Sequence, residues 1–217
     1  MKRKLVIYLT GILALAIGSN LFLNAALGVA PSCSLALTFT FLLPGSYAFY
    51  NFIVNAFCVV IECILLKRFS KAEAVQLLIT FIYAYAIKFT GLFLTGIHPT
   101  SLAEQILLAM FACFVMALGV NLTVQSHVTV MPYEGFMKAL SEKTKITFGT
   151  LRVIVDIAIT LTSILLSLCL LHSVQSVGLG TIIASCLTGF IVNLDAKLLN
   201  KRIERFIVKP QQALNIQ

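Results

Sequence analysis

The stretch at positions 16–31, AIGSNLFLNAALGVAP, is followed 101 residues later by a related stretch at positions 117–132, ALGVNLTVQSHVTVMP. Both contain a Gly-x-Asn-Leu element and a Val-x-Pro element in one register. Shared Ile, Val and Leu residues mean little in apolar segments, so the glycine, asparagine and proline identities give the match its weight. A repeat at a fixed offset predicts two structurally related halves.

The same offset continues into the following segments. Asn51, Ile53, Val54 and Asn55 correspond to Arg152, Ile154, Val155 and Asp156, and Thr80, Ile82 and Phe89 correspond to Thr181, Ile183 and Phe190. The sequence therefore predicts a first repeat over residues 1–100, a second repeat over residues 101–200 and a tail over residues 201–217.

The composition predicts that these halves lie in a membrane. Of the 217 residues, 59% are hydrophobic and 11% are charged, and the mean hydropathy is +1.00. A soluble domain is about half apolar and a quarter charged. Six apolar segments are long enough to span a bilayer, and they cover residues 5–27, 47–66, 74–97, 102–123, 149–171 and 177–196. We expect an all-α membrane protein with six transmembrane helices.

The basic residues predict the orientation of these spans. All sixteen except Lys88 and Arg152 precede the first segment or follow the second, fourth and sixth segments. Basic loops stay in the cytoplasm, so both termini are expected there. Because the basic residues lie between the apolar segments, we interpret the net charge of +8 as setting the topology of the spans and not as a nucleic-acid binding surface. Three spans per half give the two repeats opposite topology, an arrangement that many secondary transporters use.

The connection after the first span of each half, at positions 28–46 and 129–147, carries a proline near its start. Pro31 and Pro132 suit the first turn of a short helix, whose free N–H groups attract anions. Each short helix either re-enters the bilayer or lies in the interface. The tail is amphipathic and is expected to lie on the inner leaflet.

Charged residues within spans are the main candidates for a binding site, because they are costly in lipid and face the protein interior. Arg152 and Asp156 lie one helical turn apart. They form either a neutralised packing pair or a ligand site, in which Arg152 binds a carboxylate or phosphate and Asp156 accepts a proton or cation. Glu134 could pair with Arg152 or gate entry to the site. Lys88, near the middle of the third span, is expected to face either an acidic partner, for which Asp156 is the candidate, or a water-filled cavity.

The remaining polar residues point to packing more than to chemistry. Asn51 and Asn55 suit hydrogen bonds between helices or contact with a solute. Glu62 lies near a span end and is expected to be solvated. The six cysteines form no C-x-x-C pair, and no metal, cofactor or nucleotide motif is present. We therefore expect no cofactor, no metal and no enzymatic activity.

Four segments carry a family resemblance: ALGVAP at 26–31, PYEGFM at 132–137, TLRVIVD at 150–156 and VGLGT at 177–181. Through them most of the chain resembles the YczE/YyaS/YitT family of small bacterial integral membrane proteins. The resemblance implies a bacterial cell membrane location and names no substrate. Family members have an aromatic-acid pair after the first proline. This chain has Ser32-Cys33-Ser34 there, and Glu134 occupies the acid position of the second half.

The leading functional hypothesis is a secondary transporter of a small anionic or zwitterionic solute, with alternating access between inverted repeats. Its site would include Arg152, Asp156, Glu134, Lys88, Asn51, Asn55, Pro31 and Pro132. The alternatives are a substrate-binding membrane subunit of an ATP-driven importer, a scaffold or sensor, and a passive channel. The expected partners are the lipid bilayer and a solute, without nucleic acid, and a homodimer is compatible with the sequence.

Overall fold

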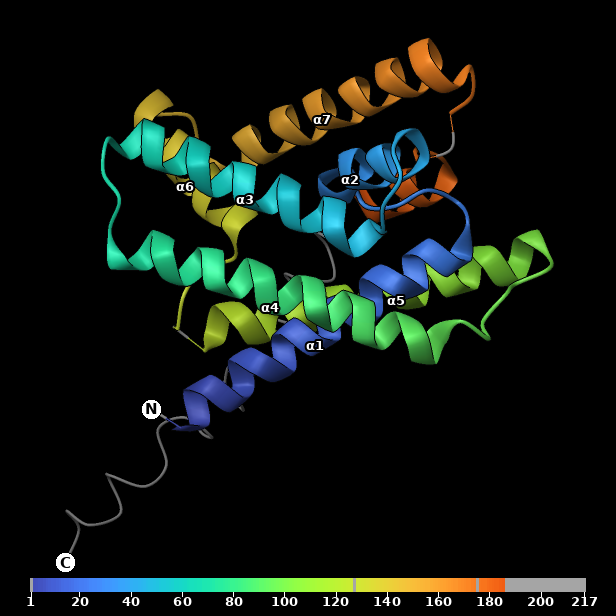
Figure 1. Cartoon of the computed structure of the whole chain (residues 1–217), viewed down its shortest axis with the longest axis horizontal. Coiled ribbons are helices and arrows are strands. Elements are labelled where there is room, and N and C mark those ends of the chain that lie inside the picture. The colour runs from blue at the N-terminus through green and yellow to red at the C-terminus, as the bar shows by residue number, and fades with distance from the viewer. Residues whose placement is uncertain (1, 127, 175, 186–217) are drawn as a thin grey trace, which may run out of the picture.

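The computed structural model describes residues 2–126, 128–174 and 176–185, and this part of the chain contains only helices, turns and connecting segments (Figure 1). Five helices are long: α1 (Lys2–Ala25), α3 (Tyr47–Leu66), α4 (Lys71–Leu94), α5 (Leu102–Gln125) and α7 (Phe148–Leu171). Two are short: α2 (Pro31–Leu42) and α6 (Pro132–Thr144). Residues 179–185 are also helical. The predicted all-α class is confirmed for the described residues.

The five long helices are each long and apolar enough to cross a membrane, so the chain is a multi-pass helical membrane protein. They coincide with the first five predicted spans. The predicted sixth span, at residues 177–196, is described only to residue 185, and the tail over residues 201–217 lies outside the described residues.

Helix α4 begins three residues before the predicted position because a capping box fixes its start. The Ser70 hydroxyl accepts a hydrogen bond from the Ala72 N–H at 3.2 Å, and the Glu73 carboxylate accepts one from the Ser70 N–H at 2.7 Å. Such reciprocal bonds satisfy N–H groups that a helix start leaves free. The helix therefore covers residues 71–94 rather than 74–97.

Helices α1 and α5 form the most extensive helix contact of the described residues. They run antiparallel, because Gly11 lies against Thr123 whereas Gly18 lies against Met116. A Cβ atom on Gly119 would lie only 2.9 Å from the Gly11 carbonyl oxygen. In lipid the hydrophobic effect does not drive helices together, so close packing at small residues such as these stabilises the helix pair instead.

Polar side chains join α1 to α4. The Asn20 amide donates to the Ile87 carbonyl and to the Thr90 hydroxyl, both at 2.8 Å. The Ser19 and Tyr83 hydroxyls share a hydrogen bond of 2.9 Å. These bonds fix the register of two apolar helices and bring Tyr83 towards the centre of the bundle.

The short helices connect the two halves of the chain. Helix α2 packs on α7, helix α6 packs on α3, and Figure 1 places α2 and α6 at opposite ends of α3. Ser34 of α2 shares a hydrogen bond of 2.9 Å with Ser163 of α7. In the repeat, Ser34 corresponds to Gly135 of α6 and Ser163 corresponds to Glu62 of α3. These two counterparts are also in contact, because a Cβ on Gly135 would lie 2.5 Å from Glu62 Oε2.

Candidate functional site

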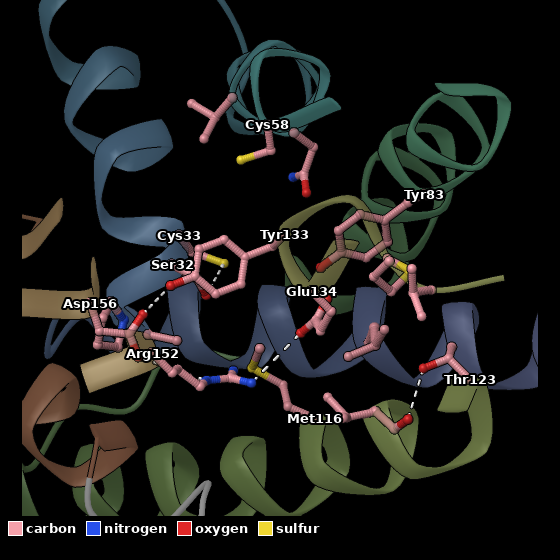
Figure 2. A pocket seen from close by; sticks show the side chains of 18 of the residues that line it. Ser32, Cys33, Cys58, Tyr83, Met116, Thr123, Tyr133, Glu134, Arg152 and Asp156 are labelled. Carbon is pink, nitrogen blue, oxygen red and sulfur yellow. Dashed lines mark hydrogen bonds and ion pairs between the residues drawn. The ribbon is translucent and has the colours of Figure 1, made fainter. Parts of the chain in front are cut away.

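A cavity of about 460 Å³ lies where the two short helices begin (Figure 2). Leu15, Tyr83 and Met116 line it, and these residues belong to the central thirds of α1, α4 and α5. The cavity is thus located halfway along the long helices. Its volume is within the range of pockets that enclose small-molecule ligands.

Positions 101 residues apart recur around this cavity. Seven pairs of lining residues have this offset: Leu15 and Met116, Ala30 and Met131, Ser32 and Tyr133, Cys33 and Glu134, Asn51 and Arg152, Asn55 and Asp156, and Tyr83 and Ala184. The two halves of the chain therefore build the cavity largely from equivalent positions.

The starts of α2 and α6 form part of the cavity wall. Each helix has a proline in its first turn, Pro31 in α2 and Pro132 in α6. Pro31 lines the cavity; Pro132 is buried and does not line it, although its chain neighbours Met131 and Tyr133 do. Ser32 and Tyr133, which follow these prolines, also line the cavity, so the first turn of each short helix borders it.

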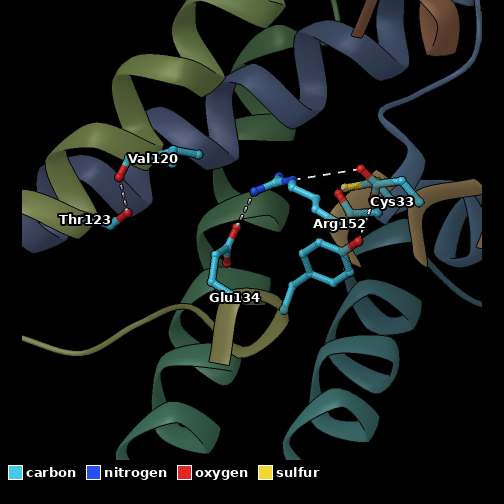
Figure 3. A network of polar contacts seen from close by, with 8 residues as sticks. Cys33, Val120, Thr123, Glu134 and Arg152 are labelled. Atoms are coloured by element: carbon cyan, nitrogen blue, oxygen red, sulfur yellow. Dashed lines mark hydrogen bonds and ion pairs between the residues drawn. The ribbon is translucent and has the colours of Figure 1, made fainter. Parts of the chain in front are cut away.

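Arg152 of α7 lies between two carboxylates (Figure 3). Its Nη1 is 3.8 Å from Glu134 Oε1, and its Nε is 3.9 Å from Asp156 Oδ2. Both distances exceed the roughly 2.7–2.9 Å of a charge-assisted hydrogen bond. The side chains of Arg152, Glu134 and Asp156 are 34%, 21% and 25% exposed. The guanidinium is therefore attracted to both carboxylates and keeps donors for a third group.

Tyr133 of α6 orients this cluster. Its hydroxyl donates a hydrogen bond to Asp156 Oδ1, and the Arg152 Cζ lies 5.7 Å from the centre of its ring. Burial, followed by the neighbouring Asp156 carboxylate, raises the pKa of the Tyr133 hydroxyl, which stays protonated and can only donate to Asp156. Burial also raises the pKa of the Glu134 carboxyl, and the Arg152 charge opposes this shift.

The opposite wall, on α3, is polar and uncharged. The Asn55 amide donates to the backbone and side-chain oxygens of Asn51, both at 2.9 Å. The Asn51 amide lies 3.5 Å from the Tyr47 hydroxyl and 4.0 Å from the Cys33 sulfur. Asn51 and Asn55 occupy the positions that correspond to Arg152 and Asp156, so the cavity has one amide wall and one charged wall.

The structure brings together six of the eight predicted site residues: Pro31, Asn51, Asn55, Glu134, Arg152 and Asp156. Pro132 is buried and does not line the cavity. The predicted pairing of Lys88 with Asp156 is wrong, because Lys88 is exposed on α4 and Asp156 contacts Tyr133 and Arg152 instead. The buried face of α4 passes through Ile87, the residue before Lys88, which directs the lysine away from the bundle.

Sequence reasoning missed Tyr133, Tyr83 and Cys33 as cavity residues. Tyr133 could have been found, because it follows Pro132 directly and corresponds to Ser32 after Pro31. The expectation that Glu62 is solvated is also wrong, since the residue is only 6% exposed. Helix α6 packs on α3 and places Gly135 against the Glu62 carboxylate, which covers it.

Comparison with curated proteins and with solved structures gives no match for this chain. A family model described as a family of unknown function, DUF6198, matches residues 2–197. The match includes both short helices and every residue of the cavity. The protein therefore belongs to the DUF6198 family.

Proposed function

We propose that this protein is a secondary transporter of a small zwitterionic solute and works by alternating access between two inverted repeats. The observation that carries the proposal is the central cavity, where seven pairs of residues separated by 101 positions form much of the wall. Inverted-repeat transporters place their substrate site at such an interface, near the middle of the bilayer.

The contacts between α1 and α5 support the inverted repeat. Gly18 lies against Ala112 and Met116, and Gly119 lies against Gly11 and Leu15. Ala112 and Met116 are each 101 residues after Gly11 and Leu15, so exchanging the two halves converts the first contact into the second. Because α1 and α5 are antiparallel, the axis that relates the halves would lie in the membrane plane.

The positions of the short helices favour re-entry over an interfacial location. Ala30 and Met131, immediately before α2 and α6, line a cavity that lies halfway along the spanning helices. Irregular backbone at that depth is tolerated only where protein or a water-filled cavity surrounds it. We infer that residues 26–42 and 128–144 each enter from one side and return to it, with their helix starts at the solute site.

The two halves differ in exposure, which indicates a cavity open towards one side. Val29 is 1% exposed and its counterpart Val130 is 40% exposed. Tyr47 is 6% exposed and its counterpart Phe148 is 40% exposed. Val130 and Phe148 line the cavity, whereas Val29 and Tyr47 do not.

The closed side is sealed by backbone contacts. The Gly180 N–H donates to the Leu27 carbonyl at 2.7 Å, and a Cβ on Gly28 would lie 2.6 Å from the Gly178 nitrogen. The open side is the one that carries Lys143 and Lys145, at the end of α6. Because basic loops remain in the cytoplasm, we assign an inward-facing state, and the outward-facing state would exchange these arrangements between the halves.

The charges in the cavity favour a zwitterion over a simple anion. One guanidinium faces two carboxylates, so an anion alone would meet Arg152 but be repelled by Glu134 and Asp156. A zwitterion can place its carboxylate or phosphate on the planar guanidinium and its cationic group between the two acids. The amides of Asn51 and Asn55 then supply neutral hydrogen bonds.

The proposal also includes the membrane location of the protein and its relationship to a known family. The distribution of basic residues supports a multi-pass protein with both termini in the cytoplasm, and the resemblance of four segments to the YczE/YyaS/YitT family supports a bacterial cytoplasmic membrane. Relationship to the YczE/YyaS/YitT family stays a prediction from the four shared segments.

A binding screen on the purified protein tests the proposal. Amino acids, betaines and phosphate zwitterions are added in turn and the unfolding temperature is measured, since a ligand of the native state stabilises it increasingly as its concentration exceeds its dissociation constant. We expect stabilisation by at least one zwitterion that Arg152→Ala abolishes and Lys88→Ala retains. Equal stabilisation of the Arg152→Ala protein would contradict the assigned site, and co-purification with ATPase subunits would favour the importer-subunit alternative.

A further inference from the structure

A second polar site is buried between α3, α4 and α6. Glu62 and Gln76 are 6% and 2% exposed, and the Gln76 Nε2 approaches Glu62 Oε1 at 3.5 Å. Among the described residues, Glu62 Oε2 and Gln76 Oε1 are both buried without a hydrogen-bond partner. An unsatisfied buried polar atom is costly, and a buried unpaired charge costs more.

One proton would satisfy both atoms. An ionised carboxylate and an amide oxygen are both acceptors and cannot bond to each other, whereas a protonated carboxyl has an O–H to donate. With the proton on Glu62 Oε2, the pair makes two hydrogen bonds: the carboxyl donates to Gln76 Oε1, and the amide donates to Glu62 Oε1. The reaction is the addition of a proton to a carboxylate, and its reversal returns the proton to water.

The surrounding charges leave Glu62 without an ion pair among the described residues. Lys138 on α6 and Arg68 after α3 attract a negative charge on Glu62, but both are exposed. Glu73 on α4 repels such a charge, and it is held at the helix start by Ser70. A proton is therefore a better neutralising partner for Glu62 than any described side chain.

The backbone of α6 joins this pair to the central cavity. A Cβ on Gly135 would lie 2.5 Å from Glu62 Oε2 and 2.6 Å from Gln76 Nε2, so the first turn of α6 rests directly on the pair. The preceding residue, Glu134, lines the cavity and faces Arg152. A shift of α6 would thus move one residue at each site.

We propose that Glu62 and Gln76 form a buried proton-binding site whose occupancy is coupled through α6 to the opening of the central cavity. The coupling rests on the proposed transport function, whereas proton binding does not. In the inward-facing state Glu62 is protonated. Movement of α6 during the exchange of states opens the pair to water and releases the proton.

Infrared spectroscopy of the purified full-length protein tests proton binding without any substrate. At neutral pH we expect a carboxylic-acid carbonyl band that is lost in Glu62→Gln and kept in Glu142→Gln, which makes the same change at an exposed site on α6. The amide introduced by Glu62→Gln can form both hydrogen bonds with Gln76 without a proton, so this variant should fold. The double variant Glu62→Gln with Gln76→Glu should restore the band. An unchanged band in Glu62→Gln, or no band in the double variant, would overturn the proton site.

Cavity opening is tested with Val130→Cys in a chain whose six cysteines are replaced. The rate of maleimide labelling at this cysteine is measured over a range of pH in two proteins, one that keeps Glu62 and one that carries Glu62→Gln. Ionisation of the introduced thiol affects both proteins equally, so the ratio of the two rates isolates Glu62. We expect a ratio of one at low pH that departs from one as pH rises. A constant ratio together with a positive infrared result would overturn the coupling between Glu62 and cavity opening, which is the element of the proposal that rests on transport. Proton binding by Glu62 would stand.

Discussion

Asn51 on α3 and Arg152 on α7 are separated by 101 residues and line the same cavity from its two walls. One position of the repeat thus carries a neutral amide in the first half and a guanidinium in the second. The repeat supplies the geometry of the cavity, and the differences between its copies supply the polarity that distinguishes one end of a bound solute from the other.

Replacement of Arg152 is expected to weaken solute binding. Arg152→Ala deletes the only cationic side chain lining the described cavity and leaves Glu134 and Asp156 to repel each other. Loss of a charge-assisted hydrogen bond corresponds to about tenfold to hundredfold weaker binding, measurable by calorimetry with the solute that the screen identifies. Lys88→Ala, which removes an exposed lysine from α4, serves as the control. Similar losses in both variants would contradict the assignment.

Replacement of Gly119 is expected to destabilise the fold. In Gly119→Ala the added Cβ would lie 2.8 Å from the Leu15 backbone nitrogen and 2.9 Å from the Gly11 carbonyl oxygen. Backbone atoms cannot relieve a clash by changing rotamer as a flexible side chain can. We therefore expect the free energy of unfolding in mixed micelles to fall by about 1–3 kcal/mol. Gly96→Ala has no atom within 4 Å of the added Cβ and should be neutral. Equal stability of the two variants would argue against the close α1–α5 contact.

The stability of the protein is expected to depend on pH through Glu134. Burial raises the pKa of this carboxyl above its ordinary value of 4.5, with Arg152 opposing, so the folded protein binds the proton more tightly than the unfolded chain. The resulting stabilisation is complete below pH 4.5 and is lost as the pH rises through the folded-state pKa. Glu134→Gln should flatten this part of the curve of unfolding temperature against pH, and Glu142→Gln should not. Parallel curves for Glu134→Gln and the unmodified protein would refute the prediction.

The sidedness of the cavity is expected to appear in thiol labelling. Val130→Cys should react rapidly with a water-soluble maleimide, and Val29→Cys should react slowly, because the native side chains are 40% and 1% exposed. In an inverted repeat the two positions are expected to lie at equal distances from the bilayer midplane on opposite sides, which makes each the control for the other. Equal rates in the absence of solute would contradict an inward-facing resting state.

Much of this fold could be predicted because its determinants are local. Runs of apolar residues define the long helices, and Pro31 and Pro132 define the short ones. Arg152 and Asp156 could be identified because charges within an apolar segment are costly. The offset also anticipated that Asn51 and Arg152 would be equivalent, although it did not predict that both would line one cavity.

The remaining features depend on which face of a helix meets its neighbour. Hydropathy places Lys88 within a span but does not distinguish the exposed face from the buried face through Ile87, one residue away. Glu62 lies near a helix end, where solvation is the usual outcome, and only the packing of Gly135 over it shows that it is buried. The hydrogen bond from Tyr133 to Asp156 likewise joins residues that only the fold brings together.

Uptake into proteoliposomes is the decisive test of zwitterion transport through the Arg152 site. Liposomes with the purified protein are incubated with a mixture of amino acids, betaines and phosphate zwitterions, and their contents are measured by mass spectrometry. We predict that at least one zwitterion accumulates with the unmodified protein and with Lys88→Ala, and that uptake falls to the level of protein-free liposomes with Arg152→Ala. No uptake of any zwitterion by the unmodified protein, or equal uptake by the Arg152→Ala variant, would contradict the proposed function.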